Sequence, residues 1–217
     1  MPGILIVKTG TTEPQVVEQF GDYDDWFLHV LGPATVVAPF QGEGLPSPEA
    51  FGGVLLTGSP ASVRDELPWM AELGRWAVKA AESVHVLGVC LGHQLIGEAL
   101  GGWVAPNPLG GEMGTTQVEL SAAGREDPLF EGLPPVLTVQ QTHKDVLLRP
   151  PAAERLGSNA NTVWQSFRRG RIRCVQFHPE LPPGALRGLL RVRGLEGHVQ
   201  DQDHGPAVLR NWRRLIS

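Results

Sequence analysis

The sequence is poor in cysteine, in net charge and in long apolar runs, and each shortage excludes a class of protein. Its two cysteines, Cys90 and Cys174, lie inside apolar runs, which argues against a disulfide framework or a multi-cysteine zinc site and favours a reducing compartment. The formal net charge is -5 with charges scattered along the chain, so no nucleic-acid or anionic-membrane surface is indicated. The N-terminal run Ile4 to Val7 is too short for a signal-peptide core, and no run reaches membrane-spanning length. We therefore expect a cytoplasmic protein with neither nucleic acid nor a membrane as a partner.

The length and apolar content suit one α/β domain over residues 1–217. The chain has 217 residues, of which 41% are hydrophobic, which is enough for one sizeable core. Short apolar runs alternate in the first half with helical segments, which predicts a mostly parallel open sheet flanked by helices. The expected strands are Ile4 to Val7, Ala34 to Ala38, Val54 to Thr57 and Val84 to Val89, and the expected helices are Pro68 to Ser83 and Leu91 to Leu100.

Beyond Gly101 the pattern predicts a smaller, mainly antiparallel strand region, because strand-like runs are broken there by Gly, Pro and Asn. These runs are Thr116 to Leu120, Val136 to Val139, Val146 to Leu148, Val163 to Phe167 and Ile172 to Phe177. The tail, residues 181–217, mixes leucine and arginine at helical spacing and is expected to end in a helix from Pro206 to Leu215.

One cysteine stands at a predicted strand-to-helix turn. The run Gly88-Val89-Cys90-Leu91-Gly92 follows an apolar strand and opens a helix, and glycines on both sides permit the tight turn that exposes a nucleophile. The positive end of the helix dipole also favours the thiolate. This pattern alone leaves open a buried structural cysteine. Cys174 has no glycine bracket and no following helix, so we expect it to be a core residue.

A base and its orienting group follow a later strand, in Gln176-Phe177-His178-Pro179-Glu180. His178 can take the thiol proton and Glu180 can fix the imidazole tautomer. Because Pro179 restricts the backbone, both side chains can serve one site. Alone, this segment also fits a surface histidine beside a solvated glutamate; beside a nucleophile turn it favours catalysis. The order Cys, His, Glu differs from that of the α/β-hydrolases.

Together these segments resemble the class I (triad) glutamine amidotransferases. Gly88-Val89-Cys90-Leu91-Gly92-His93-Gln94 and Gln176-Phe177-His178-Pro179-Glu180 are similar to the two signature motifs of that family, and Leu55-Leu56-Thr57-Gly58-Ser59-Pro60 resembles its oxyanion strand. The resemblance covers about residues 4–180 and implies a flavodoxin-like fold. Further details resemble stand-alone proteins related to the glutaminase domain of GMP synthetase, including Pro106-Asn107-Pro108 followed by Glu112 and Gly114.

Carried over to this chain, the resemblance implies a catalytic triad of Cys90, His178 and Glu180. The backbone N–H groups of Gly58 and Leu91 would hold the oxyanion. Gln94 and His143 would bind substrate, His143 because Gln141-Thr142-His143-Lys144-Asp145 resembles a recognition segment of the family. On residue type alone, Gln94 and His143 can equally be structural.

The implied activity is the release of ammonia from L-glutamine through a cysteinyl γ-glutamyl thioester, which requires no cofactor. A separate ammonia-accepting synthetase subunit is the implied partner, and the oligomeric state stays open. Two alternatives stay open as well: hydrolysis of another γ-glutamyl amide or peptide by the same triad, and a non-enzymatic binding or regulatory protein that keeps the fold. Histidines and aspartates at 198–204 form no known ligand spacing, so we predict no metal site.

Overall fold

The computed structural model describes residues 3–149 and 151–216, which form one nine-stranded mixed sheet and one two-stranded sheet. The parallel half consists, in spatial order, of β2 (Thr35–Val37), β1 (Ile4–Val7), β3 (Gly53–Leu56), β4 (His85–Val89) and β11 (Ile172–Val175). The same sheet continues antiparallel through β10 (Ser166–Arg169), β9 (Glu154–Ser158), β6 (Glu112–Leu120) and β7 (Val136–His143). The small antiparallel sheet pairs β5 (Trp103–Pro106) with β8 (Asp145–Arg149).

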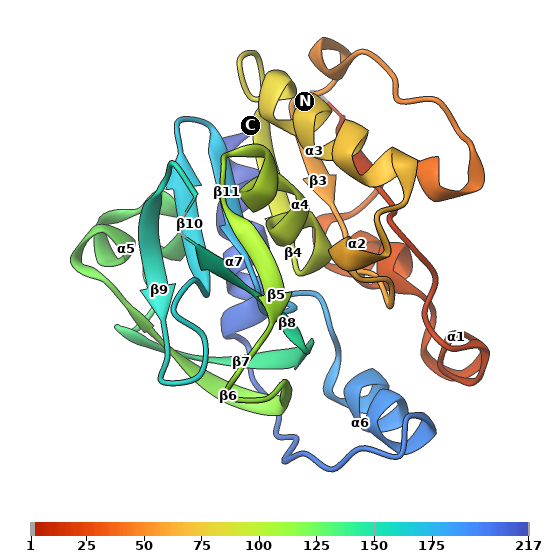
Figure 1. Ribbon diagram of the computed structural model, residues 1–217, viewed down its shortest axis with the longest axis vertical. Helices are drawn as coiled ribbons and strands as arrows, with labels where there is room; N and C mark the ends of the chain where they lie inside the picture. The colour runs from red at the N-terminus through yellow and green to blue at the C-terminus, as the bar shows by residue number, and fades with distance from the viewer. Residues whose placement is uncertain (1–2, 150, 217) are drawn as a thin grey trace.

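Helices cover both faces of the parallel half (Figure 1). In β1, Leu5 and Val7 join the core beneath α3 (Pro68–Ala80) and α4 (Leu91–Ala99). Ile4 and Ile6 join the opposite core, beneath α2 (Tyr23–Leu31) and α7 (His204–Leu215). Neighbouring strand residues point to opposite faces, so a continuous apolar run supplies both cores, as expected for a sheet buried on two sides.

The remaining helices lie at the edges of these layers. A third cluster joins α1 (Pro14–Phe20) and α6 (Pro183–Val192) with part of α2, and α5 (Ala122–Glu126) contacts β9. Short 3₁₀ turns occur at Pro39–Gln41, Pro48–Ala50, Val63–Asp65 and Pro128–Phe130.

The expected α/β architecture is confirmed, with differences at particular segments. The predicted antiparallel strands continue the main sheet as β6, β7, β9 and β10. The expected strand Val163 to Phe167 is largely wrong, since Val163 is 54% exposed and β10 begins at Ser166. The reason is a turn after β9, in which the Asn159 side chain accepts the backbone N–H groups of Asn161 and Thr162. Helices α1, α2 and α5 and strands β5 and β9 were not predicted.

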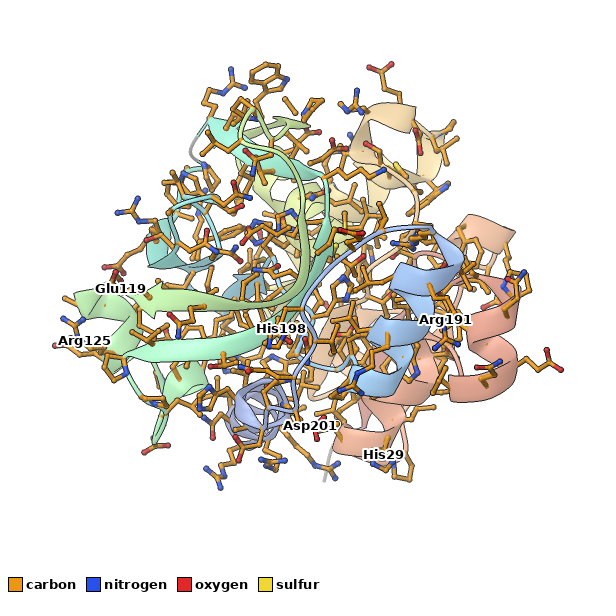
Figure 2. All side chains as sticks on the ribbon, turned by 90° about the horizontal axis from the view of Figure 1, so that it is seen from below. His29, Glu119, Arg125, Arg191, His198 and Asp201 are labelled. Atoms are coloured by element: carbon orange, nitrogen blue, oxygen red, sulfur yellow. The ribbon has the colours of Figure 1, made fainter. Side chains whose placement is uncertain are left out.

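The tail is part of the core rather than an appendage. Trp212 of α7 is fully buried among residues of the sheet and α2. Between α6 and α7 the chain runs extended along β6, where the Thr115 N–H donates to the His198 carbonyl at 2.6 Å. Figure 2 shows this segment, with His198 and Asp201, passing across the β6–β7 pair. In the two described ranges, no helix combines the length and apolarity needed to cross a membrane.

Candidate active site

Three adjacent parallel strands end at the same edge of the sheet and place three predicted site residues together. Gly58 follows β3, Cys90 follows β4 and His178 follows β11. The Cys90 N–H donates to the Val175 carbonyl at 2.9 Å, which ties the first turn of α4 to β11. Carboxyl ends of parallel strands are where ligand sites collect in open α/β sheets.

The Cys90 turn is strained, and the strain falls on the cysteine itself. Cys90 has φ 50° and ψ -102°, one of two positive φ values at non-glycine residues in the described ranges. Such a conformation is rare for a residue with a Cβ and is typical of a nucleophile between strand and helix. Both predicted glycines are needed for close packing: a Cβ on Gly88 would lie 2.8 Å from the Gly92 carbonyl oxygen, and one on Gly92 would lie 2.7 Å from the Leu56 oxygen.

His178 is oriented by Glu180 inside the protein. Its Nδ1 lies 2.7 Å from Glu180 Oε1, and both side chains are at most 1% exposed. Burial alone would lower the pKa of His178, but the charges of Glu180 and Cys90 raise it to about 10. The other ring nitrogen, Nε2, has no fully aligned hydrogen-bond partner in the described part of the chain, although the Cys90 thiol is close enough to raise the pKa of His178 by its charge and by a hydrogen bond. Such loose alignment is common before substrate binds.

Two backbone N–H groups near the Cys90 side chain have no acceptor in the described part of the chain. Neither the Gly58 N–H nor the Leu91 N–H pairs with an acceptor among residues 3–149 and 151–216. Gly58 also lies against Cys90 and His178, since a Cβ there would sit 2.6 Å from His178 Cε1 and 3.3 Å from Cys90 Cβ. Two free donors at a nucleophile can stabilise an oxyanion.

Cys90 opens into a cavity of about 490 Å³, a volume within the usual range for small-molecule sites. The predicted Gln94 and His143 both line it. Gln94 Nε2 donates to the Asp145 carbonyl at 2.9 Å and to Gln176 Oε1 at 3.1 Å. His143 Nδ1 lies 3.3 Å from the same carbonyl oxygen, so one backbone group of β8 anchors both side chains.

A comparison with known families fits this arrangement. The family model described as "Glutamine amidotransferase class-I" matches residues 33–190, most of the chain. The chain belongs to the class I glutamine amidotransferase family.

Individual relatives support the family membership and show how much of each relative this chain covers. The chain is 32% identical over 231 residues to a glutamine-hydrolysing GMP synthase of Aeropyrum pernix, an alignment that covers 99% of this chain and 36% of the relative. It therefore spans about a third of that protein. It is 36% identical over 134 residues to one of the subunits of a glutamine-hydrolysing GMP synthase of Saccharolobus solfataricus, covering 60% of this chain and 68% of the relative. The solved glutamine amidotransferase of Thermotoga maritima shares the fold, with a TM-score of 0.75 at 21% identity over 100% of this chain and 99% of that one.

Glu112, one of the residues that carried the family resemblance, lies at the centre of a buried hydrogen-bond network that contacts His143. Its carboxylate accepts the Asn159 amide and the Thr162 hydroxyl at 2.6 Å each and the Gln165 amide at 2.8 Å. It also lies 3.2 Å from His143 Nε2. Burial raises the pKa of Glu112, but the contacts with His143 and Thr162 lower it further than burial raises it. The buried charge of Glu112 thus holds the cavity-wall side chain of His143 in place.

Sequence reasoning missed three residues at the site. Tyr23 of α2 is 2% exposed and stacks on His178, with ring centroids 6.2 Å apart. Arg193, just after α6, pairs with Glu13, just before α1, and both line the cavity that contains Cys90. Tyr23 and Glu13 lie in a region assigned no element from the sequence, and Arg193 lies in the tail beyond the resemblance, so no local signal marked them.

The tail histidines make ordinary structural contacts. His204 Nδ1 accepts the Thr138 N–H at 2.8 Å at the start of α7, and His198 faces Gln200. No cluster of three or more metal-ligating side chains occurs within residues 3–149 and 151–216.

Proposed function

We propose that this chain hydrolyses the side-chain amide of L-glutamine, with Cys90 as nucleophile, His178 as general acid and base, and Glu180 as the group that orients His178. The observation that carries the proposal is the strained turn that holds Cys90 at a cavity beside the buried His178–Glu180 pair. Membership of the class I glutamine amidotransferase family supports the same reaction.

The proposed cycle has two halves. The Cys90 thiolate attacks the amide carbon of glutamine, His178 gives its proton to the nitrogen, and the carbon–nitrogen bond breaks to release ammonia. Water, deprotonated by His178, then attacks the γ-glutamyl thioester. The carbon–sulfur bond breaks, glutamate leaves and the thiolate is restored.

The free N–H groups of Gly58 and Leu91 would hold the oxyanion in both halves, because neither donates a hydrogen bond within the described part of the chain. One such donor typically contributes about 3 kcal/mol to the barrier reduction. Gln94 and His143 would contact the remainder of the substrate, since both line the cavity and are anchored through the Asp145 carbonyl.

We further infer that the ammonia is used by a separate synthetase subunit. The relative from Saccharolobus solfataricus is named as one subunit of a GMP synthase, and the alignment with the longer Aeropyrum pernix enzyme covers about a third of that protein. The glutaminase chemistry proposed above does not depend on which molecule accepts the ammonia.

The proposal is tested by trapping the nucleophile. Incubation with the glutamine analogue 6-diazo-5-oxo-L-norleucine is expected to modify one thiol, located at Cys90 by peptide mass spectrometry, and L-glutamine is expected to protect it. Cys90→Ser is the matched control and should stay unmodified. Absence of both labelling and glutamate release from L-glutamine, in the chain alone and with a co-purified synthetase, would reject a glutaminase and favour a binding protein.

A further inference from the structure

One wall of the cavity contains Arg193, whose guanidinium is bound to two neighbouring side chains. Arg193 contacts both Glu13 oxygens, with Nη2 3.3 Å from Oε2, and its Nη1 donates to Thr142 Oγ1 at 3.0 Å. The side chains of Arg193 and Glu13 are only 22% and 23% exposed. All three residues line the cavity that contains Cys90, and we call Glu13, Thr142 and Arg193 the Arg193 wall.

The Arg193 wall lies on the His178 side of the cavity. Gln140 of β7 pairs with His178, whose N–H donates to the Gln140 carbonyl at 2.9 Å, and Thr142 stands two residues further along the same strand. Behind the wall, Tyr23 stacks on the His178 ring, and its hydroxyl is within range of the charges of both Arg193 and Glu13. Backbone pairing and ring stacking therefore place this wall next to the general acid.

A second arginine–carboxylate pair lines another part of the same cavity. Arg64 Nε lies 3.4 Å from Asp145 Oδ2, and the Arg64 side chain is 53% exposed. The Asp145 carbonyl accepts the Gln94 amide. This pair is thus tied to the proposed substrate-binding side chains rather than to His178, and it provides a natural control.

The position of His178 decides which part of a substrate meets the Arg193 wall. Glu180 occupies Nδ1, so only Nε2 can deliver a proton to the departing nitrogen. A substituent on that nitrogen that extends past His178 on the side of Thr142 would meet Arg193. To make room, Arg193 would have to leave Glu13 and Thr142, which separates a partly buried ion pair and leaves its charges unsatisfied.

We propose that Arg193, held by Glu13 and Thr142, is a specificity-determining residue that restricts the leaving group to ammonia and excludes amines carried by N-substituted γ-glutamyl amides. The inference rests on the proposed glutaminase reaction and deepens it, because it separates glutamine from γ-glutamyl amides and peptides as substrates. Of the Arg193 wall, Thr142 lies inside the matched range 33–190, but Glu13 and Arg193 lie outside it, so the family match does not include the ion pair of this wall.

The test compares three substrates with leaving groups of increasing size: L-glutamine, γ-glutamylmethylamide and γ-glutamyl-p-nitroanilide. Glutamate release gives kcat/KM for each, and intact-protein mass spectrometry detects acylation of Cys90. Wild type should lose activity steeply with substituent size. In Arg193→Ala, the kcat/KM of the anilide relative to glutamine should rise about tenfold or more, the scale on which pocket shape discriminates. Glu13→Gln should shift the ratio in the same direction, from a different segment of the chain.

Two further variants separate specificity from general damage. Arg64→Ala should change all three substrates by a similar factor, and Arg193→Lys should give an intermediate ratio, because it keeps a cation but loses the paired contacts with Glu13. An unchanged ratio in both Arg193→Ala and Glu13→Gln, or an equal loss for every substrate, would overturn the inference. If no substrate acylates Cys90 in wild type, the glutaminase reaction itself fails.

Discussion

One cysteine lies within a strand and the other directly follows the neighbouring strand, and the two differ in backbone strain and in access to a cavity. Cys174 lies within β11, opposite Gly88 of β4, and is fully buried. Burial raises the pKa of its thiol well above the ordinary value. Cys90 is also buried, at 5% exposure, but it stands one residue beyond β4 in a strained turn that faces a cavity and His178. Burial alone therefore does not distinguish Cys174 from the proposed nucleophile Cys90; the position relative to the strand end does.

The largest expected effect comes from removing the thiol of Cys90. Cys90→Ser should lower kcat for glutamine at least about a thousandfold, because Cys90 is the nucleophile of the proposed triad and the members of such a triad act as a unit. Glutamate release at saturating glutamine measures this loss. Equal losses in Cys90→Ser and Cys174→Ser would show that the contrast between the two thiols is false.

A smaller but still large effect is expected at the glycine that touches both Cys90 and His178. Gly58→Ala introduces a Cβ 2.6 Å from His178 Cε1, which must displace the imidazole or the oxyanion donor, so kcat should fall about a hundredfold. Gly44→Ala is the control, because no atom lies within 4 Å of its added Cβ. Activity retained in Gly58→Ala, with the fold verified by thermal unfolding, would remove Gly58 from the proposed site.

The pH dependence of activity should reveal the protonated His178 beside Cys90, a charge that Cys174 lacks. The pKa of His178 is raised to about 10, so the protonated imidazole needed by the leaving nitrogen persists at neutral pH and is lost as pH rises through about 10. The kcat/KM for glutamine should fall over that range. In Glu180→Gln the first of the two charges that raise this pKa is gone, so the fall should begin at lower pH. A pH profile that is identical in both proteins would contradict the role given to Glu180.

The raised pKa of His178 also makes the stability of the fold depend on pH. Because the folded pKa lies above the ordinary value of 6.5, the stabilisation from protonated His178 is fully present below about pH 6.5 and disappears as pH approaches 10. Urea unfolding of wild type and Glu180→Gln across this range should show a smaller alkaline loss in the variant.

The smallest effect is expected at Cys174. Cys174→Ala should leave kcat within about twofold and lower the free energy of unfolding by about 1 kcal/mol, a typical loss for one buried substitution. Thiol titration of wild type should show one accessible thiol in the folded protein and a second only after unfolding. Rapid modification of Cys174 in the folded state would contradict its assignment to the core.

Local patterns were sufficient for much of the parallel half and for the triad candidates. These candidates depend on short-range features of the sequence, which are recognisable without the tertiary structure. They are the strand before Cys90, the glycines that flank it, and the pair His178 and Glu180. The sequence predicted that Gly88 and Gly92 permit the tight turn. In the structure they permit close packing with each other and with Leu56, while the strained backbone is that of Cys90. Strand ends were less predictable, because β6 and β7 extend beyond their apolar runs through polar residues that pair with each other.

Residue types and short spacings in the chain were enough to indicate an α/β sheet, a nucleophile turn and a histidine with its orienting carboxylate. Tertiary structure alone decided what surrounds them. Glu13 and Arg193 are 180 residues apart, and they meet only because α1 packs against α6 and Tyr23 of α2 lies over His178. No local periodicity encodes such a meeting, since it depends on how separate apolar surfaces fit together after the sheet has formed.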